Sequence, residues 1–273
     1  MNYAALHFRD LALSSLLARD GTPPDQPAAL LSSGERERSH LTAVNQAARK
    51  FEIQPGFRTT RGLARCPNLL LLDPDFTAEK SARSETLAFV DSLVPDFETT
   101  TPETYLLDLS TLLMASEADW ITQTLSASSY LALPLQIGLG KTPDLAHLAS
   151  LCPNQADPLT LKLANLALAK NFPLPHAPVL QLWGLQTLDD LSKLPRQGLA
   201  ERLGKELAQL HDIAHGKHHR LLKLYRAQDH YRITHQFKPP VANHEPLLFM
   251  AKRLLQTLCN RLHHHQRAAA EIR

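Results

Sequence analysis

YAALHFRDLALSSLL, at residues 3–17, predicts an apolar strand that passes through two charged residues directly into a helix. A second apolar stretch, YLLDLS at residues 105–110, predicts another strand, and Pro102 and Glu103 precede it in a predicted corner. Stretches of strand length and of helical period alternate along the first 151 residues. Such a mixture of α and β elements is typical of an α+β or α/β fold.

The predicted elements can be given by their ranges. Strands are expected at Tyr3–Phe8, Ala28–Ser32, Leu41–Val44, Leu69–Leu72, Tyr105–Leu109 and Leu133–Leu139. Helices are expected at Leu11–Ala18, Asn45–Phe51, Thr60–Cys66, Phe76–Val94, Glu117–Leu125 and Asp144–Leu151. After Pro158 we expect a helix at Leu159–Ala169, a proline-rich linker at Asn171–Pro178, short helices over Val179–Gly216, a strand at Tyr231–Phe237 and a helix at Pro246–Leu262.

Length and composition bound the class of protein. A chain of 273 residues is long enough for two to four small domains, and its 44% apolar content is ordinary for a soluble globular protein. No apolar stretch reaches the ~20 residues of a membrane span, and no secretion signal is recognisable. Cys66, Cys152 and Cys259 are far apart and odd in number, which suits a reducing compartment.

Charge is distributed unevenly along the chain. From Lys217 onward there are eleven basic and three acidic residues, a net charge of +8, whereas the preceding residues carry 18 basic and 24 acidic residues. A basic tail on a mildly acidic body indicates a polyanionic partner. The alternative is an ordinary solvated basic surface.

Glycine turns between short helices form a candidate DNA-binding motif. Val179–Leu191 places Gly184 between two helical segments, and Gly204, followed by Lys205, forms a second turn in ERLGKEL. Paired helices with glycine turns can present backbone N–H groups to a phosphate without reading sequence. The alternative is a small packed helical domain without a ligand.

Other motifs are absent or incomplete. The adjacent histidines His218-His219 and His263–His265 lack metal-ligand spacing, and neither HExxH nor CxxC occurs, so we expect no metal and no cofactor. Gly138-Leu-Gly140-Lys-Thr142 lacks the first glycine of a phosphate-binding loop and predicts a strand-to-helix turn. Asn45–Phe51 predicts a short helix that presents Arg49, either to a triphosphate or simply to solvent.

The order of these segments resembles the Y-family (translesion) DNA polymerases over nearly the whole chain. The family's opening motif, hydrophobic-His-hydrophobic-Asp-x-Asp, becomes Leu6-His-Phe-Arg-Asp-Leu11 here, and its fingers motif Asn-Tyr-x-Ala-Arg becomes Asn45-Gln-Ala-Ala-Arg49. Its Cys-Pro-x-Leu is similar to Cys66-Pro-Asn-Leu69, and its second acidic motif becomes Thr101-Pro-Glu-Thr-Tyr-Leu-Leu-Asp108. A later lysine-rich helix motif resembles residues 138–150, with Pro143 at its first lysine.

The departures from the family pattern affect the catalytic positions. The resemblance is expected to place Phe8 at the first metal-binding aspartate and Thr104 at the glutamate, which leaves Asp10 and Glu103 as the remaining acids. Two-metal nucleotidyl transfer needs clustered carboxylates. Gln46 replaces the tyrosine over the triphosphate and Leu13 occupies the sugar-gate position, so Arg49 is what remains of the nucleotide pocket.

These losses resemble the ImuB-like branch, which is catalytically inactive. The resemblance implies an α+β fold with a palm (1–20 and 73–165), fingers (21–72), a helix-hairpin-helix thumb (166–220) and a partial little finger (221–273), since a complete little finger is longer. It implies sequence-independent DNA binding through Gly184, Gly204, Lys205, Arg220, Lys223 and Arg226. It also implies SOS-linked DNA repair in a bacterial, nucleoid-associated cytoplasmic setting. The expected partners are a RecA-like protein, an error-prone replicative-type polymerase and the sliding clamp.

Two rival hypotheses stay open. The first is an active polymerase that uses displaced carboxylates, with Asp10, Glu103 and Asp108 as candidates. The second is a protein-interaction module without DNA contact, which would lack the salt dependence that phosphate contacts impose.

Overall fold

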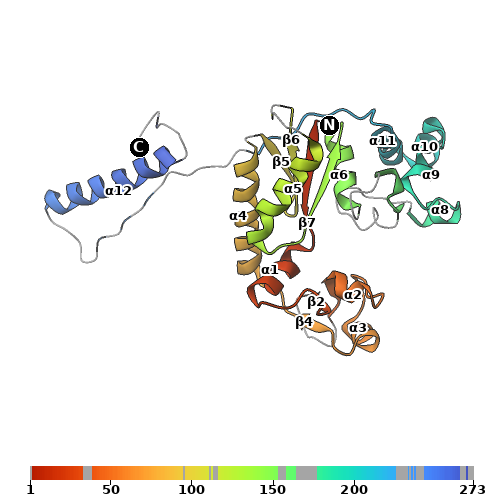
Figure 1. The fold of residues 1–273 in the computed structure, drawn as a ribbon, viewed down its shortest axis with the longest axis horizontal. Coiled ribbons are helices and arrows are strands. Elements are labelled where there is room, and N and C mark those ends of the chain that lie inside the picture. Colours follow the sequence, from red (N-terminus) through yellow and green to blue (C-terminus); the bar gives the residue numbers. More distant parts are fainter. Residues whose placement is uncertain are drawn as a thin grey trace. The chain divides into compact units, whose positions relative to one another are not determined.

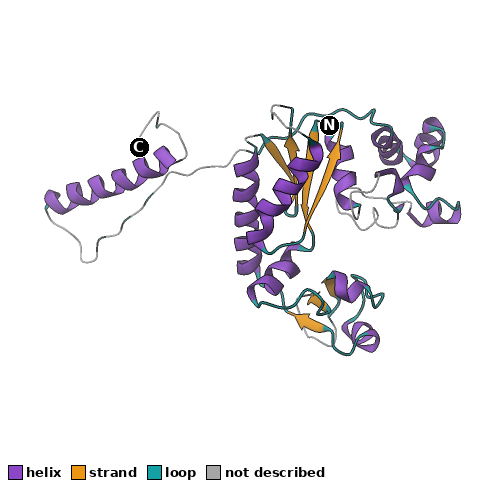
Figure 2. Cartoon of the chain, in the orientation of Figure 1, coloured by secondary structure: helices purple, strands orange, loops and turns teal. Residues whose placement is uncertain are grey.

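The computed structural model describes residues 2–32, 39–94, 96–110, 112, 116–152, 158–163, 177–225, 233, 235, 237, 243–264 and 269. The chain forms two compact units, Met1–Tyr225 and Arg226–Arg273 (Figure 1). The first unit holds two sheets and most of the helices (Figure 2). The described part of the second unit holds α12 (His244–His264), close to the predicted Pro246–Leu262.

A four-stranded sheet forms the centre of the first unit. Its strand order is β5-β6-β1-β7, where the four ranges are β1 (Tyr3–Phe8), β5 (Phe97–Thr101), β6 (Thr104–Asp108) and β7 (Leu135–Gly140). All its neighbouring strands are antiparallel. An antiparallel sheet with helices on its faces is the α+β alternative of the two predicted classes.

The two faces of this sheet pack against different helices (Figure 1). Because side chains alternate along a strand, Ala4, Leu6 and Phe8 enter one apolar core together with Phe89 and Val90 of α4 (Phe76–Leu93). The helix α5 (Glu117–Ala127) contributes to the same core. On the other face, Ala5 and Leu106 pack against Ala146 of α6 (Pro143–Leu151). We call these the α4 face and the α6 face.

Helix α6 approaches the sheet very closely. A Cβ at Gly138 would clash with the backbone N of Ser150, and one at Gly140 would clash with the backbone N of Ala146. The two glycines of the predicted strand-to-helix turn are therefore required for helix packing, which agrees with rejecting a phosphate-binding loop at this place.

A second, smaller sheet follows α1 (Leu11–Arg19). Its order is β3-β2-β4, with β2 (Ala28–Leu31), β3 (Leu41–Val44) and β4 (Leu70–Leu72). The helices α2 (Gln46–Arg49) and α3 (Thr59–Arg65) belong to this segment. Gly62 lets α3 pack tightly, since a Cβ there would lie 3.0 Å from the Leu41 side chain and 3.1 Å from that of Leu69.

Short helices and a connecting segment complete the first unit. The helices are α8 (Ala177–Leu182), α9 (Leu188–Ser192), α10 (Arg196–Leu203) and α11 (Lys205–Ala214), and they share a leucine-rich core. Residues 217–225, which we call the strap, contain no helix or strand. No helix among the described residues is long and apolar enough to cross a membrane.

Most predicted elements are confirmed within two residues at each end, but two expectations differ. Phe97–Thr101 forms a strand that was not predicted, because three consecutive threonines give it little apolar content. At the predicted helix Leu159–Ala169, the described residues show a 3-10 turn at Pro158–Thr160. Most of the predicted strand Tyr231–Phe237 and most of the linker Asn171–Pro178 lie outside the described residues.

Candidate functional site

The end of β1 meets the turn between β5 and β6, where the expected catalytic positions lie. His7 and Thr104 are directly opposite each other in the antiparallel register. The Phe8 backbone N–H donates a hydrogen bond of 2.8 Å to the Glu103 carbonyl oxygen. The structure thus brings the backbones of Phe8, Glu103 and Thr104 to one corner.

The side chains at this corner do not converge, which corrects the role expected for Phe8. The Phe8 ring is fully buried on the α4 face, with edge-on contacts to Phe89 and Tyr105 at centroid distances of 6.5 and 6.0 Å. Thr104 lies on the opposite face, where its hydroxyl is 2.9 Å from the His7 Nδ1. A carboxylate at position 8 would therefore enter the apolar core and could not share a metal with one at position 104.

Arg9 is the side chain that instead projects at this corner. Its backbone N–H bonds to the Pro134 carbonyl oxygen at 3.0 Å, which continues the strand pairing by one residue. Alternation then places Arg9 and His7 on the same face. Arg9 is not among the predicted site residues. It nevertheless occupies the aspartate position when the family's opening motif is aligned with Leu6-His-Phe-Arg9.

Two polar contacts join this corner to α2, in the segment of the small sheet. The Arg49 Nη2 lies 3.0 Å from Oδ2 and 3.4 Å from Oδ1 of Asp10. The Arg9 Nη1 donates a hydrogen bond of 3.1 Å to the Gln46 Oε1. Asp10 adopts a left-handed backbone conformation (φ 50°, ψ 46°) and does not cap α1 with its side chain. Its carboxylate is thus committed to Arg49.

The position of α2 makes these contacts possible. The Asn45 side chain caps α2 by accepting from the Ala48 N–H, and it also bonds to the backbone of Ala28 and Gln26. The Arg49 Nε donates to the Val44 carbonyl oxygen at 3.2 Å. The helix is therefore fixed to the small sheet, and Arg49 is directed towards Asp10.

The electrostatic environment at this corner favours the pairing of Asp10 with Arg49. Burial raises the pKa of Asp10 above its usual value, whereas Arg49 and Arg9 act to lower it. Burial and the nearby Arg49 lower the pKa of Arg9. Burial, His147 and Arg9 lower the pKa of His7 to about 4, so His7 is neutral at pH 7. The corner therefore holds the two guanidinium groups of Arg9 and Arg49, and Arg49 pairs with the Asp10 carboxylate.

These residues do not fit the two Mg²⁺ ions of a polymerase. Mg²⁺ prefers near-octahedral oxygen ligands, and a pair of ions needs several carboxylates. Asp10 is bound by Arg49, and Asp108 pairs with Tyr3 at the other end of β1, roughly 13 Å along the strand from Thr104. In the part of the chain that the structure describes, no cluster of three or more His, Cys, Asp or Glu side chains could hold a metal ion.

Leu13 also differs from its expected place beside a nucleotide. Its side chain is fully buried between α1 and the small sheet, in a cluster with Leu16, Ala28 and Leu30. It therefore packs the core. Pro143 occupies the first turn of α6, where Thr142 caps the helix and where proline lacks no needed hydrogen bond.

The glycine turns lie where the sequence predicts them. Gly184 (φ 77°) follows α8, and Gly204 (φ 93°) joins α10 directly to α11. Both angles lie in the region that favours glycine. Lys205 is exposed at the first position of α11. This geometry is compatible with phosphate binding by Gly184, Gly204 and Lys205, which stays a prediction.

Arg220, a predicted phosphate contact, forms ion pairs within the chain. Its guanidinium donates to both Glu98 oxygens at 2.7 and 3.1 Å and to the Asp144 Oδ1 at 2.9 Å. Both carboxylates are buried, so their charges need this partner. These contacts engage the guanidinium group within the chain, and DNA binding by Arg220 stays a prediction. Arg226 lies outside the described residues.

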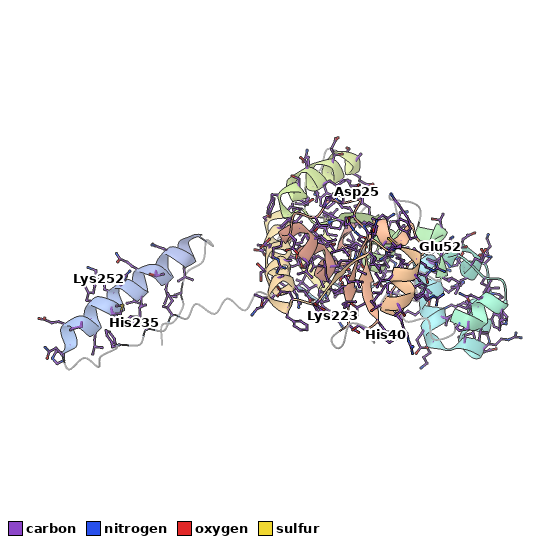
Figure 3. All side chains as sticks on the ribbon, turned by 90° about the horizontal axis from the view of Figure 1, so that it is seen from below. Asp25, His40, Glu52, Lys223, His235 and Lys252 are labelled. Atoms are coloured by element: carbon purple, nitrogen blue, oxygen red, sulfur yellow. The ribbon has the colours of Figure 1, made fainter. Side chains whose placement is uncertain are left out.

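Other contacts fasten the strap beside Arg220. The His218 Nδ1 lies 2.7 Å from the Asp144 Oδ2, and the Lys223 backbone N–H donates to Glu98 at 2.7 Å. Tyr225 stacks on Phe97 at a centroid distance of 5.3 Å. Only the backbone of Lys223 takes part, and its side chain is exposed (Figure 3). Lys223 thus stays available for the predicted phosphate contact.

Comparisons with known proteins agree with this architecture. A model of the impB/mucB/samB family matches residues 13–151. A DNA polymerase IV of Mannheimia succiniciproducens is 27% identical over 206 residues, which are 70% of this chain and 57% of that protein. A DNA polymerase IV of Yersinia pestis is 28% identical over 229 residues, which are 78% and 61%. The chain thus spans between half and two thirds of the length of these curated relatives.

Two solved structures share this fold. DinB from Sulfolobus solfataricus has a TM-score of 0.66 at 13% identity, over 81% of this chain and 69% of that chain. A Y-family DNA polymerase chimera has a TM-score of 0.62 at 14% identity, over 82% and 70%. At such identities the likeness is one of fold, and it confirms the predicted α+β, Y-family polymerase-like architecture.

Proposed function

The chain belongs to the impB/mucB/samB family, and from this premise we propose that it is a catalytically inactive, ImuB-like relative of the Y-family DNA polymerases. It would bind DNA without sequence preference and recruit partners in translesion synthesis. The observation that supports inactivity best is the pairing of Asp10 with Arg49 and of Arg9 with Gln46. These bonds occupy, with the chain's own side chains, the corner where a polymerase would hold metals and a triphosphate.

The partner set rests on the resemblance to the ImuB-like branch. A RecA-like protein, an error-prone replicative-type polymerase and the sliding clamp are the proposed partners. The relatives' polymerase activity supports a place in DNA synthesis across damage, while Arg9 and the core position of Phe8 argue against nucleotide incorporation by this chain. Arg9 is proposed to replace the first metal ligand, in place of Phe8.

The first prediction is that the purified chain incorporates no nucleotide on a primer–template with Mg²⁺ or Mn²⁺. The double variant Phe8→Asp/Thr104→Glu is also expected to be inactive, because the new carboxylates would lie on opposite faces of the sheet. Primer extension on a sequencing gel measures this, with an active Y-family polymerase as positive control. Template-dependent extension that Glu103→Ala abolishes would establish the rival, an active polymerase with displaced carboxylates.

The second prediction is weak, salt-dependent binding to duplex DNA through the thumb and strap. We expect dissociation constants of roughly 10⁻⁴–10⁻⁶ M at physiological salt, with log K falling linearly as log salt rises. Lys205→Ala/Lys223→Ala should reduce that slope by about 0.9 for each lost phosphate contact. Fluorescence anisotropy across a salt series gives the slope.

Two matched variants define the control. Lys193→Ala removes a thumb lysine that is already paired with Asp189, so it should leave the slope unchanged. Arg49→Ala should change DNA affinity little, because Arg49 is bound to Asp10. A larger loss from Arg49→Ala than from the double lysine variant would locate DNA binding at the fingers corner. Affinity that does not respond to salt would favour a protein-interaction module.

A further inference from the structure

The outer face of α3 gathers basic and aromatic side chains that the proposed thumb contacts do not use. Between Arg49 and Arg65 the chain has five basic residues and a single acid, Glu52. We define the α3 patch as Phe57, Arg58, Arg61 and Arg65 at α3 together with Lys50 and Phe51, which follow α2 and precede Glu52, the partner of Arg65. It belongs to the segment that holds the small sheet, far along the chain from the thumb helices.

Packing directs the basic side chains of α3 outward. Thr59 and Gly62 are buried, and Gly62 touches Leu41 and Leu69 of the small sheet's core. Arg58, Arg61 and Arg65 follow at spacings of three and four residues, which places them along one helix face. All three are exposed. The tight approach at Gly62 therefore fixes which face of α3 meets solvent.

Aromatic rings lie among these guanidinium groups. The Arg61 Cζ is 4.0 Å from the centre of the Phe57 ring, and the Arg65 Cζ is 5.5 Å from it. Arg65 also donates to the Glu52 carbonyl and carboxylate oxygens at 2.9 Å each, which holds the turn after Phe51. Phe51 itself is 46% exposed. The patch thus presents one open ring and one ring covered by a planar cation.

Much of the positive charge of the patch is not neutralised. Arg49 pairs with Asp10, and Arg65 pairs with Glu52. Among the described residues no ion pair joins Lys50, Arg58 or Arg61 to a carboxylate. His40, which is exposed, pairs with Arg58 through the backbone and adds a further polar group at the edge (Figure 3).

We propose that the α3 patch binds single-stranded nucleic acid, with Lys50, Arg58 and Arg61 contacting phosphates and Phe51 stacking on a base. Surfaces that bind single strands combine basic groups that follow the backbone with aromatic rings on which bases stack. An acidic peptide would satisfy the charges but would leave the exposed ring without a partner. The site is separate from the thumb, so it extends the proposed DNA binding without depending on it.

The test compares single-stranded and duplex probes. A fluorescent oligo-dT and a blunt duplex are titrated against the full chain and against Arg58→Ala/Arg61→Ala. We expect the double variant to weaken oligo-dT binding and to reduce its salt slope by about 0.7 for each lost contact, while duplex binding stays unchanged. Lys80→Ala/Arg83→Ala, which removes the same charge from the exposed face of α4, is the matched control and should change neither.

A second variant separates stacking from charge alone. Phe51→Ala keeps every basic group and should weaken oligo-dT binding about fivefold or more, since stacking on one ring contributes at least that much. Inorganic polyphosphate and oligoglutamate, used as competitors, should bind equally to Phe51→Ala and to the natural chain. Equal loss of oligo-dT and duplex binding in the Arg58/Arg61 variant overturns the separate site, and an unchanged oligo-dT affinity in Phe51→Ala overturns base stacking. Duplex binding that is lost in Lys205→Ala/Lys223→Ala but kept in the variants of the α3 patch tests the thumb independently.

Discussion

Arg220→Ala is expected to lower the free energy of unfolding by about 3–5 kcal/mol, because removing one partner of a buried ion pair leaves an uncompensated charge. Here two buried carboxylates, Glu98 and Asp144, would lose their guanidinium at once. Burial opposes the charged form of Glu98, but hydrogen bonds from Arg220 and the Lys223 N–H hold the pKa of Glu98 below its usual value. Urea unfolding followed by circular dichroism at pH 7 measures the loss.

Lys223→Ala is the matched control for this prediction. It removes the same charge from the same strap, but its side chain is exposed and only its backbone binds Glu98. We expect it to change stability by less than about 0.5 kcal/mol. Conversely, an Arg220→Ala variant of unchanged stability with a reduced salt slope for DNA would mean that Arg220 contacts phosphate after all.

The second large effect is a loss of stability in mild acid, caused by two buried histidines. His7 and His147 pack on the α6 face, and burial is the largest cause that lowers the pKa of each to about 4. Asp144 and Glu98 act to raise the pKa of His147, and Arg220 acts to lower it. In the unfolded chain both imidazoles take up protons near pH 6.5.

Proton linkage gives the direction in which the free energy of unfolding changes with pH. Between pH 6.5 and about 4 the unfolded state binds more protons, so stability rises with pH and is lost as pH falls through this window. Each histidine contributes on the order of 3 kcal/mol to the loss, and less in combination because His147 itself lowers the pKa of His7. Glu98, whose folded pKa is depressed, loses its contribution only below its unfolded pKa near 4.5.

Unfolding free energies measured at intervals from pH 7.5 to 5 test this explanation. His7→Gln, which keeps a polar group opposite Thr104, and His147→Gln should each flatten the pH dependence. The exposed His219 offers the control, because His219→Gln should leave the curve unchanged. A stability that stays constant from pH 7.5 to 5 in the natural chain would contradict burial of the neutral imidazoles.

The local sequence pattern was sufficient to predict most of the strands and helices and the family. The apolar strand Tyr3–Phe8 and the helix after it were predicted to within one residue, because alternation and helical period are properties of neighbouring residues. The glycine turns at Gly184 and Gly204 were predicted for the same reason, since positive φ is a local demand. The threonine-rich strand Phe97–Thr101 was not predicted, because its stability comes from pairing with β6 and not from its own composition.

The roles of single side chains depended on contacts between distant segments. Phe8 and Arg9 are neighbours in sequence, yet strand alternation sends Phe8 into the α4 core and Arg9 to Gln46, 37 residues away. In the sequence Arg220 resembles any other basic residue of the strap. Only the structure shows that it binds Glu98 and Asp144, which lie more than seventy residues away in the chain. A sequence motif names the residue types, but burial and partnership are properties of the assembled sheet and helices, and these decide whether a charge meets a ligand or another part of the chain.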